Sequence, residues 1–351
     1  MEFLERSEPG TVEARIPEPV LKLKLEAEFL AGCIKHRRKT STSSHSGPQT
    51  TELEEIWEIG PNIGVGASSS VRFEKLRQNH HRDREAPQFR AVKVVKKSYG
   101  IGRGWDYRRE LSAIAQFSEP RYAPYFVHTH GWFENNDEIF IAMEFFPLGD
   151  LGKVIGSGPP LSEIETSQII RQISEGIRVM HESGFAHRDL KPSNILVWTR
   201  SPVWIVKLAD FGICKQGVED DTRITEIGTP GYVAPEVLRI VPVREFSVAI
   251  DIWAVGVITV ELLLRRRLFR YMGDLLSYVK GDMPLDLDSD ASRISLSASC
   301  RDFIQGLLIP DPARRLKAAA ILSHQWITEL GSSGNSQASF YTVLLAPTFN
   351  N

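Results

Sequence analysis

Residues 187–197 read HRDLKPSNILV and residues 206–215 read VKLADFGICK, and these two stretches decide the fold. In each, charged or amide side chains adjoin a short apolar run that is typical of a β-strand. Two loops bordered by strands therefore carry Asp189, Lys191, Asn194 and Asp210. Two acids, a lysine and an asparagine would be costly to bury on loops without a ligand, so the grouping indicates a binding or catalytic site.

The four side chains suit the transfer of a phosphoryl group. Such a transfer needs metal ions across the phosphates, a carboxylate beside the attacking hydroxyl, and cations near the developing negative charge. Asp189 can contact the attacking hydroxyl, and Lys191 can neutralise the transferring phosphate. Asn194 and Asp210 offer the oxygen ligands that Mg²⁺ prefers.

In order and spacing, the two stretches match a catalytic loop of the form H-R-D-L-x-x-x-N and a D-F-G motif, so the chain resembles the protein kinase family. The resemblance runs from Trp57 to Trp326. It implies an α+β, two-lobed kinase fold over residues 53–329, with a small β-rich lobe at 53–145 and a larger helical lobe at 150–329. ATP and Mg²⁺ are the cofactors that the resemblance implies, with ATP in the cleft between the lobes.

The resemblance also assigns an ion pair in the β-rich lobe. RAVK at residues 90–93 resembles the V-A-I-K strand of the family, which makes Lys93 the residue that grips the α- and β-phosphates. Ala91 of the same motif is assigned to nucleotide binding. Glu110, in a predicted helix, stands at the spacing of the glutamate that pairs with this lysine.

Residues 63–71, IGVGASSSV, form a glycine loop that is weak evidence when taken alone, because Ser69 stands where a third glycine would complete G-x-G-x-x-G. The resemblance places this loop between the first two strands of the lobe, where glycines let backbone amides approach the phosphates. A serine at the third position is expected to stiffen the tip and to weaken ATP binding modestly. The residues of the loop assigned to nucleotide binding are Ile63, Gly64, Val65, Gly66, Ala67, Ser68, Ser69, Ser70 and Val71.

The hinge between the lobes is predicted at MEFFPLGD, residues 143–150. By resemblance, Glu144 and Phe146 present backbone groups to adenine, and Met143 stands at the back of the pocket. Asp150 reaches the ribose or a basic side chain of the substrate.

Two further features resemble structural parts of the family. GTPGYVAPE at residues 228–236 resembles the end of an activation segment, and Glu236 is expected to pair with Arg315 of DPARR. Asp251, in DIWAVG, is expected to brace the catalytic loop from the central helix.

Lys191 and Thr229 are the residue types that serine/threonine kinases resembling this chain carry at these positions. Protein substrates with Ser or Thr hydroxyls are therefore expected. The segment GTPGYVAPEVL looks most like the calcium/calmodulin-dependent group. After Trp326 the sequence is mostly small and polar, and no calmodulin-binding helix is expected there.

Arg188 precedes the catalytic aspartate, which in the family often marks control by phosphorylation of the activation segment. Thr225 is the expected phosphosite and Thr222 the second choice, with an upstream activating kinase as a partner. An unmodified threonine is the alternative reading.

Composition excludes several other classes of protein. Of 351 residues, 42 are Lys or Arg and 44 are Asp or Glu, a balance that argues against nucleic acid or a membrane surface as a partner. No apolar run reaches the roughly 18 residues of a membrane span. The 3 cysteines lie far apart, without metal or disulfide spacing, so we expect a reducing compartment, the cytoplasm or the nucleus.

The pattern of apolar residues gives a coarse map of the elements. Short apolar runs between turn residues predict strands at 57–66, 69–76, 89–97, 127–134 and 138–146. Spacings of three and four predict helices at 105–117 and 162–184. The apolar stripe expected on the second helix comprises Ile164, Ile169, Ile173, Ile177 and Met180.

The ends of the chain differ in character from the rest. Residues 1–52 are expected to be a disordered or weakly structured extension, with a basic, Ser/Thr-rich linker at 35–50. The segment 21–32, LKLKLEAEFLAG, fits either a short strand or an amphipathic helix and stays unassigned. Residues 330–351 form a short tail.

Three rival functions were weighed. A pseudokinase, a binding scaffold without turnover, predicts a lost lysine, catalytic aspartate or metal aspartate, whereas Lys93, Asp189 and Asp210 are all present. A kinase-like small-molecule phosphotransferase usually lacks a segment such as GTPGYVAPE. A dinucleotide-binding oxidoreductase needs a helix after the glycines, where this chain has a predicted strand.

Overall fold

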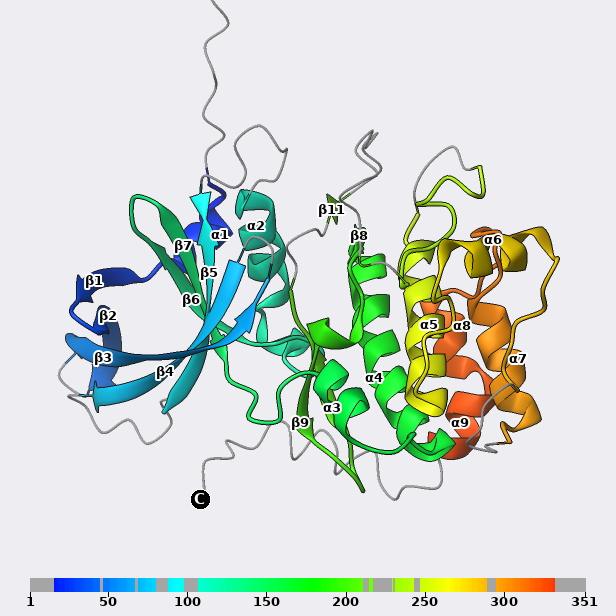
Figure 1. Cartoon of the computed structure of the whole chain (residues 1–351). Helices are drawn as coiled ribbons and strands as arrows, with labels where there is room; N and C mark the ends of the chain where they lie inside the picture. The colour runs from blue at the N-terminus through cyan, green and yellow to red at the C-terminus, as the bar shows by residue number, and fades with distance from the viewer. Residues whose placement is uncertain are drawn as a thin grey trace, which may run out of the picture.

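The computed structural model has a β-rich N-terminal lobe and a helical C-terminal lobe, which confirms the predicted α+β, two-lobed fold (Figure 1). It describes residues 16–44, 47–66, 69–79, 88–97, 107–210, 215–216, 229, 231–242, 247–288 and 295–331.

The N-terminal lobe is built on a seven-stranded antiparallel sheet with the order β1-β2-β3-β4-β5-β7-β6. Its strands are β1 (Glu26–Leu30), β2 (Cys33–Ser44), β3 (Gly47–Val65), β4 (Ser69–Asn79), β5 (Phe89–Lys96), β6 (Thr129–Glu134) and β7 (Glu138–Glu144). Helix α2 (Tyr107–Phe117) packs its apolar face on this sheet, since Leu111 shares one buried cluster with Val95 of β5 and Ile141 of β7.

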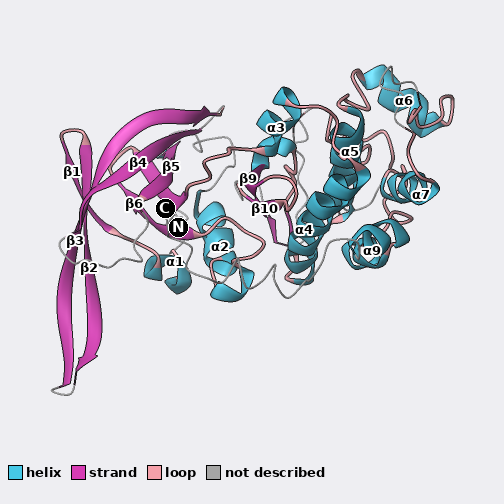
Figure 2. Ribbon diagram, turned by 90° about the horizontal axis from the view of Figure 1, so that it is seen from below, coloured by secondary structure: helices cyan, strands magenta, loops and turns pink. Residues whose placement is uncertain are grey.

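The expectation of a disordered linker is wrong for its described part. Residues 33–44 form β2, which pairs with β3 in an unbroken register from Cys33 opposite Glu58 to Ser44 opposite Gly47. Figure 2 shows this hairpin extending from the sheet. The ladder satisfies the backbone groups of both strands, and threonines suit an extended conformation, so a polar composition did not exclude a strand. The unassigned segment, residues 21–32, holds the last two residues of helix α1 (Glu18–Lys22) and all of strand β1.

The C-terminal lobe packs helices around the apolar helix α5, almost all of whose residues are buried. Its helices are α3 (Leu151–Ser157), α4 (Glu163–Glu182), α5 (Ala249–Leu264), α6 (Met272–Lys280), α7 (Ala298–Leu307), α8 (Ala318–Ser323) and α9 (Gln325–Gly331). Two small antiparallel sheets pair β9 (Ile195–Thr199) with β10 (Ile205–Leu208) and β8 (Phe185–Ala186) with β11 (Lys215–Gln216). Among the helices described, none combines the length and apolar character that crossing a bilayer requires.

Helix α4 begins at a capping box, in which Ser162 accepts a hydrogen bond from the backbone of Glu165 and the Glu165 side chain accepts one in return. Four members of the predicted apolar stripe are buried: Ile169, Ile173, Ile177 and Met180. Ile164 is instead 46% exposed, because it lies in the first turn, before the helix enters the core.

A buried ion pair joins Glu236 to Arg315, which lies between helices α7 and α8. Arg315 donates to Glu236 through two nitrogens, at 2.6 and 2.7 Å, as the sequence predicted. Both side chains are at most 1% exposed. Arg315 also donates to the carbonyls of Ile309, Pro310 and Ala249, so its charge is well satisfied.

Replacing Arg315 by Met should lower the free energy of unfolding by about 3–5 kcal/mol, because the Glu236 carboxylate would stay buried without its partner. Denaturant unfolding of the whole chain measures this change. Arg314→Met is the matched control, since the neighbouring Arg314 is exposed and should change stability by less than about 0.5 kcal/mol. Equal losses for the two variants would contradict the role of the pair.

Candidate active site

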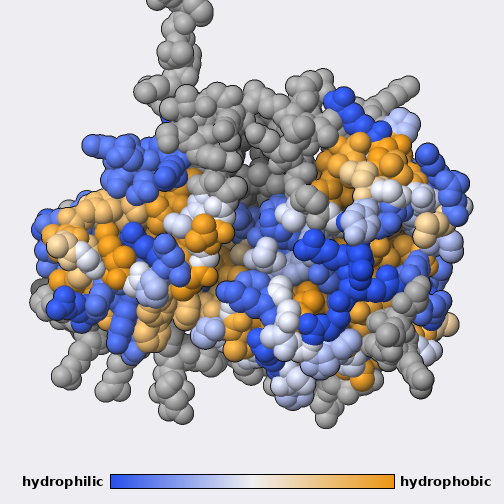
Figure 3. Space-filling view, in the orientation of Figure 1, coloured by the Kyte–Doolittle hydropathy of each residue, from blue (hydrophilic) through white to orange (hydrophobic). Residues whose placement is uncertain are grey.

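A cavity of about 610 Å³ is lined by residues of both lobes. From the predicted nucleotide site it brings together Ile63, Gly64, Val65, Gly66, Ser69, Val71, Ala91, Lys93, Glu144, Phe146 and Asp150. On the face shown in Figure 3, apolar side chains gather over the β-rich lobe. Val65, at the cavity, is 82% exposed, so an apolar ligand surface would find an uncovered partner there.

Two predicted loop residues, Ala67 and Ser68, lie outside the described part of the chain. Ser70 is described but does not line the cavity, contrary to its assignment. Ser69 and Val71 line it, and successive side chains of a strand point to opposite faces, so the side chain of Ser70 in β4 faces away.

Lys93 of β5 lies between two carboxylates. Its Nζ donates to Glu110 Oε1 of α2 at 2.6 Å and to Asp210 Oδ1 at 2.8 Å, so the predicted pair is formed. Burial lowers the pKa of Lys93, but the charges of Asp210 and Glu110 outweigh it and raise the pKa above its ordinary value. Burial raises the pKa of Glu110, an effect that the positive charge of Lys93 partly offsets. Lys93 therefore carries a lasting positive charge into the cavity.

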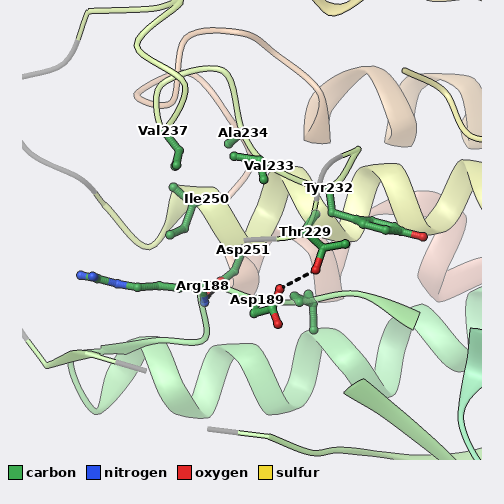
Figure 4. Close-up of a pocket in the computed structure, with 11 residues that line it drawn as sticks. Arg188, Asp189, Thr229, Tyr232, Val233, Ala234, Val237, Ile250 and Asp251 are labelled. Atoms are coloured by element: carbon green, nitrogen blue, oxygen red, sulfur yellow. Dashed lines mark hydrogen bonds between the residues drawn. The ribbon is translucent and has the colours of Figure 1, made fainter. Parts of the chain in front are cut away.

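The side chains around Asp189 form a closed hydrogen-bonded group. Lys191 Nζ donates to Asp189 Oδ2 at 2.6 Å and to Thr229 Oγ1 at 2.7 Å. Thr229 in turn donates to Asp189 Oδ1 at 3.0 Å, and Figure 4 shows its hydroxyl pointing at the carboxylate. Asn194 Nδ2 donates to the Asp189 carbonyl at 2.8 Å and to Oδ2 at 3.2 Å. The carboxylate of Asp189 is thus held in one orientation.

Thr229 was singled out in the sequence as a sign of substrate class, and its contact with Asp189 was not foreseen. The sequence next to Thr229 gives no local signal of that contact. Thr229 and residues 231–237 pack beside residues 188–190, and this packing brings the hydroxyl to the carboxylate.

Asn194 and Asp210 are the residues that could hold a metal ion. Both line the cavity, and the Asp210 side chain is 41% exposed. Since Asn194 binds Asp189 through its nitrogen, its amide oxygen remains as a ligand. No group of three or more His, Cys, Asp or Glu side chains at metal distance exists within the described residues. The pair fits Mg²⁺, which is usually bound by one or two protein ligands, with waters and phosphate oxygens completing the shell.

Asp210 has a backbone φ of 66°, in the left-handed region that few residues other than glycine adopt. Arg188, directly before Asp189, has a φ of 68°. Such conformations cost of order 1–3 kcal/mol each and persist where the surroundings impose them. Both residues adjoin the group that the sequence assigned to catalysis.

Asp251, in the first turn of α5, holds the turn at Arg188. Its carboxylate accepts the backbone N–H groups of His187 at 2.9 Å and Arg188 at 2.8 Å, and it lies 2.8 Å from His181 Nε2. Burial raises the pKa of Asp251, but the hydrogen bond and charge of His181 together with the backbone donor of Arg188 lower it below its ordinary value. The predicted brace is therefore present as a buried carboxylate with its acceptor positions occupied.

At the hinge, the Glu144 side chain is bound to Lys207 of β10, with Nζ 2.8 Å from Oε2. Glu144 Oε2 also accepts the backbone N–H of His128 at 3.2 Å. This ion pair joins β7 of the sheet to β10, the strand that leads to Asp210. Lys207 was missed in the sequence, although a lysine inside the apolar run VKL is a usable signal for a buried partner.

Two hinge assignments are modified by local hydrogen bonds. The carbonyl of Phe146 accepts the N–H of Gly149 at 3.0 Å. The carboxylate of Asp150 caps α3 by accepting the N–H of Lys153 at 3.0 Å, so a ligand would share this carboxylate with the helix. The phosphosite candidates Thr225 and Thr222 lie outside the described residues.

The model of a family described as "Protein kinase domain" matches residues 57–327. The serine/threonine-protein kinase DCLK3 of Mus musculus is 31% identical over 95% of this chain and 40% of its own length. A calcium/calmodulin-dependent protein kinase of Metarhizium anisopliae is 30% identical over 81% of this chain and 70% of its own. A probable serine/threonine-protein kinase of Saccharomyces cerevisiae, KCC4, is 30% identical over 81% of this chain and only 27% of its own length. The chain thus spans well under half of two of these relatives.

Replacing Asp251 by Ala should lower the free energy of unfolding by about 3–5 kcal/mol, because two buried N–H groups and His181 lose their acceptor. Asp251→Asn should cost less, since one acceptor oxygen remains. Asp137→Ala, at an exposed turn, serves as the control. Denaturant unfolding near neutral pH measures all three.

The stability difference between the natural chain and Asp251→Asn is expected to depend on pH. The folded-state pKa of Asp251 is depressed, so its contribution is fully present above the unfolded value, 3.8, and is lost as the pH falls through the lower folded value. The stability advantage of wild type over Asp251→Asn should shrink as the pH falls below about pH 4. An advantage that did not shrink there would contradict this assignment.

Proposed function

The chain belongs to the protein kinase family, and on that premise we propose that it transfers the γ-phosphoryl group of ATP to serine or threonine hydroxyls of protein substrates. One observation carries the proposal: the Lys93–Glu110–Asp210 group and the Asp189–Lys191–Asn194 group meet at a single cavity. These are the cation, the metal ligands and the carboxylate that phosphoryl transfer requires.

Each side chain has a role that follows from its contacts. Lys93, kept protonated by two carboxylates, binds the phosphates of the nucleotide and orients them. Asp189, fixed by three donors, orients the attacking hydroxyl and accepts its proton. Lys191 lies beside that carboxylate and balances negative charge on the transferring group. Asn194 and Asp210 would hold Mg²⁺, which would supply positive charge against the negative charge of the nucleotide phosphates.

Two observations support a serine or threonine hydroxyl as the acceptor. The relatives compared above include proteins named serine/threonine kinases, at about 30% identity. In addition, Lys191 donates to Thr229, and Thr229 donates to the carboxylate of Asp189. These two side chains occupy the space on one side of that carboxylate. We propose Ser/Thr specificity on this basis, with basic or other generic protein substrates as the first assay. A catalytically weak scaffold is the rival that the assay excludes.

Phosphotransfer from labelled ATP to generic protein substrates tests the proposal. The natural chain should be active, and Asp189→Asn should reduce kcat by about 10²-fold or more, because the amide can orient the hydroxyl but cannot accept its proton. Asp137→Asn is the matched control and should retain full activity, since Asp137 lies at an exposed turn. Activity in both the natural chain and Asp189→Asn, or in neither, would contradict the proposal.

Ser69 offers a second test, and here the structure changes the expectation. Ser69 is the first residue of β4, paired opposite Val95 of β5, so its backbone is already held in a strand. Because the sheet already fixes the backbone at position 69, a serine there does not stiffen the tip of the loop. Ser69→Gly should change the KM for ATP by less than about twofold, because glycine adds freedom where the sheet fixes the backbone. Steady-state kinetics at varied ATP measure this, and a several-fold drop in KM would restore the original expectation.

A further inference from the structure

Residues 23–25, which precede the family-matched region, cover the edge of the sheet at β6. Leu25 N–H donates to the Trp132 carbonyl at 2.7 Å, and Trp132 N–H donates to the Leu23 carbonyl at 2.9 Å. The Lys24 ammonium lies 2.6 Å from Glu134 and stacks over the Trp132 ring. Backbone and side-chain contacts therefore bind this segment to an edge strand that would otherwise present unpaired groups.

Gly131 makes room for the segment. Its φ is 140°, a conformation that side chains rarely adopt. A Cβ at this position would lie 2.7 Å from both the Leu23 carbonyl oxygen and Leu25 Cγ. The glycine is thus required by the covering segment and not by the strand alone.

Helix α1, just before this segment, packs on α2, and Figures 1 and 2 show the two helices side by side. Val20 of α1 is 1% exposed and belongs to the same buried cluster as Leu111 and Ile114 of α2. The Val20 carbonyl accepts the indole N–H of Trp132 at 2.8 Å. The next residue, Leu21, is 47% exposed.

We propose that residues 17–25, the N-terminal brace, position α2 so that Glu110 remains paired with Lys93. A helix of five residues has no stability of its own, so α1 is placed by Trp132 and by the contact of Val20 with the core. Val20 is the buried residue of α1, and α1 packs on the helix that carries Glu110. Val20 is a positioning residue: it lines neither the cavity nor the group around Asp189. This proposal rests on the proposed function for its kinetic consequence.

Val20→Asp and Leu21→Asp form a matched pair on adjacent positions of one helix. Val20→Asp should lower kcat by about 10-fold to 100-fold, because a shift of roughly 1 Å in a positioning group can cost this much. Leu21→Asp should leave kcat within about twofold, since its side chain is already exposed. Val20→Ala, a milder change, replaces Val20→Asp if the latter fails to fold. Equal kcat values for the Val20 and Leu21 variants would overturn the brace.

A double-mutant cycle separates positioning from general loss of structure. If the brace acts through Glu110, Val20→Ala should lower kcat in the natural chain but by less than about twofold in the Glu110→Gln background. The same fold-loss in both backgrounds would show a structural effect only and would overturn the proposal.

Amide hydrogen exchange over residues 107–117 tests the brace without relying on turnover. Val20→Ala should speed exchange in α2, and Leu21→Ala should not. Unchanged exchange in Val20→Ala would overturn the brace. A natural chain that showed no phosphotransfer would count against the proposed function alone, because the exchange measurement still tests the brace.

Discussion

The contact of Lys93 with Glu110 and Asp210 is the interaction on which the rest of the structure depends. Removing the charges of Lys93 and Glu110 from water is expensive, and the arrangement is tolerable because the ammonium donates to Glu110 and to the partly exposed Asp210 at short distance. Those carboxylates come from α2 and from the loop after β10, whereas the lysine comes from β5. The three elements must therefore lie together for the contact to form, and all three side chains line the cavity between the lobes.

The helical lobe also contains buried charged side chains that are stabilised by several hydrogen bonds. Asp251 accepts two backbone N–H groups and contacts His181, and the Glu236–Arg315 pair is completed by carbonyl acceptors. In both cases a charge that would be costly alone fixes a segment of irregular backbone, where no helix or strand could do so. The strained φ of Arg188 is held in this way, directly before the carboxylate that we assign to proton transfer.

Sequence reasoning found the parts of the site that are local in the chain. Asp189, Asn194 and Asp210 stand at spacings that only a few loops satisfy, and strands and helices with clear periodicity were located correctly. What it missed depends on which strands pair and in which register. The polar run before residue 45 could be recognised as β2 only from its ladder with β3, and the outward side chain of Ser70 follows from the register of β4. A lysine in an apolar run, as at position 207, and a glycine inside a strand, as at 131, are signals that could have been used.

The N-terminal lobe includes strands that precede residue 57, where the family resemblance begins. Ile34 of β2 shares a second buried cluster with Val92 and Phe140, on the sheet that carries Lys93. Nearby, the buried guanidinium of Arg90 binds Glu74 at 2.6 Å and donates to His36 Nε2 at 3.0 Å. Because a guanidinium only donates, His36 must accept there and is neutral, with its proton on Nδ1 facing the Glu26 carbonyl at 2.9 Å. A residue three positions from Lys93 is therefore satisfied by the segment before residue 57. Strand β5, which carries Lys93, and strand β2 stabilise one another. The segment before residue 57 is therefore part of the fold that presents the site.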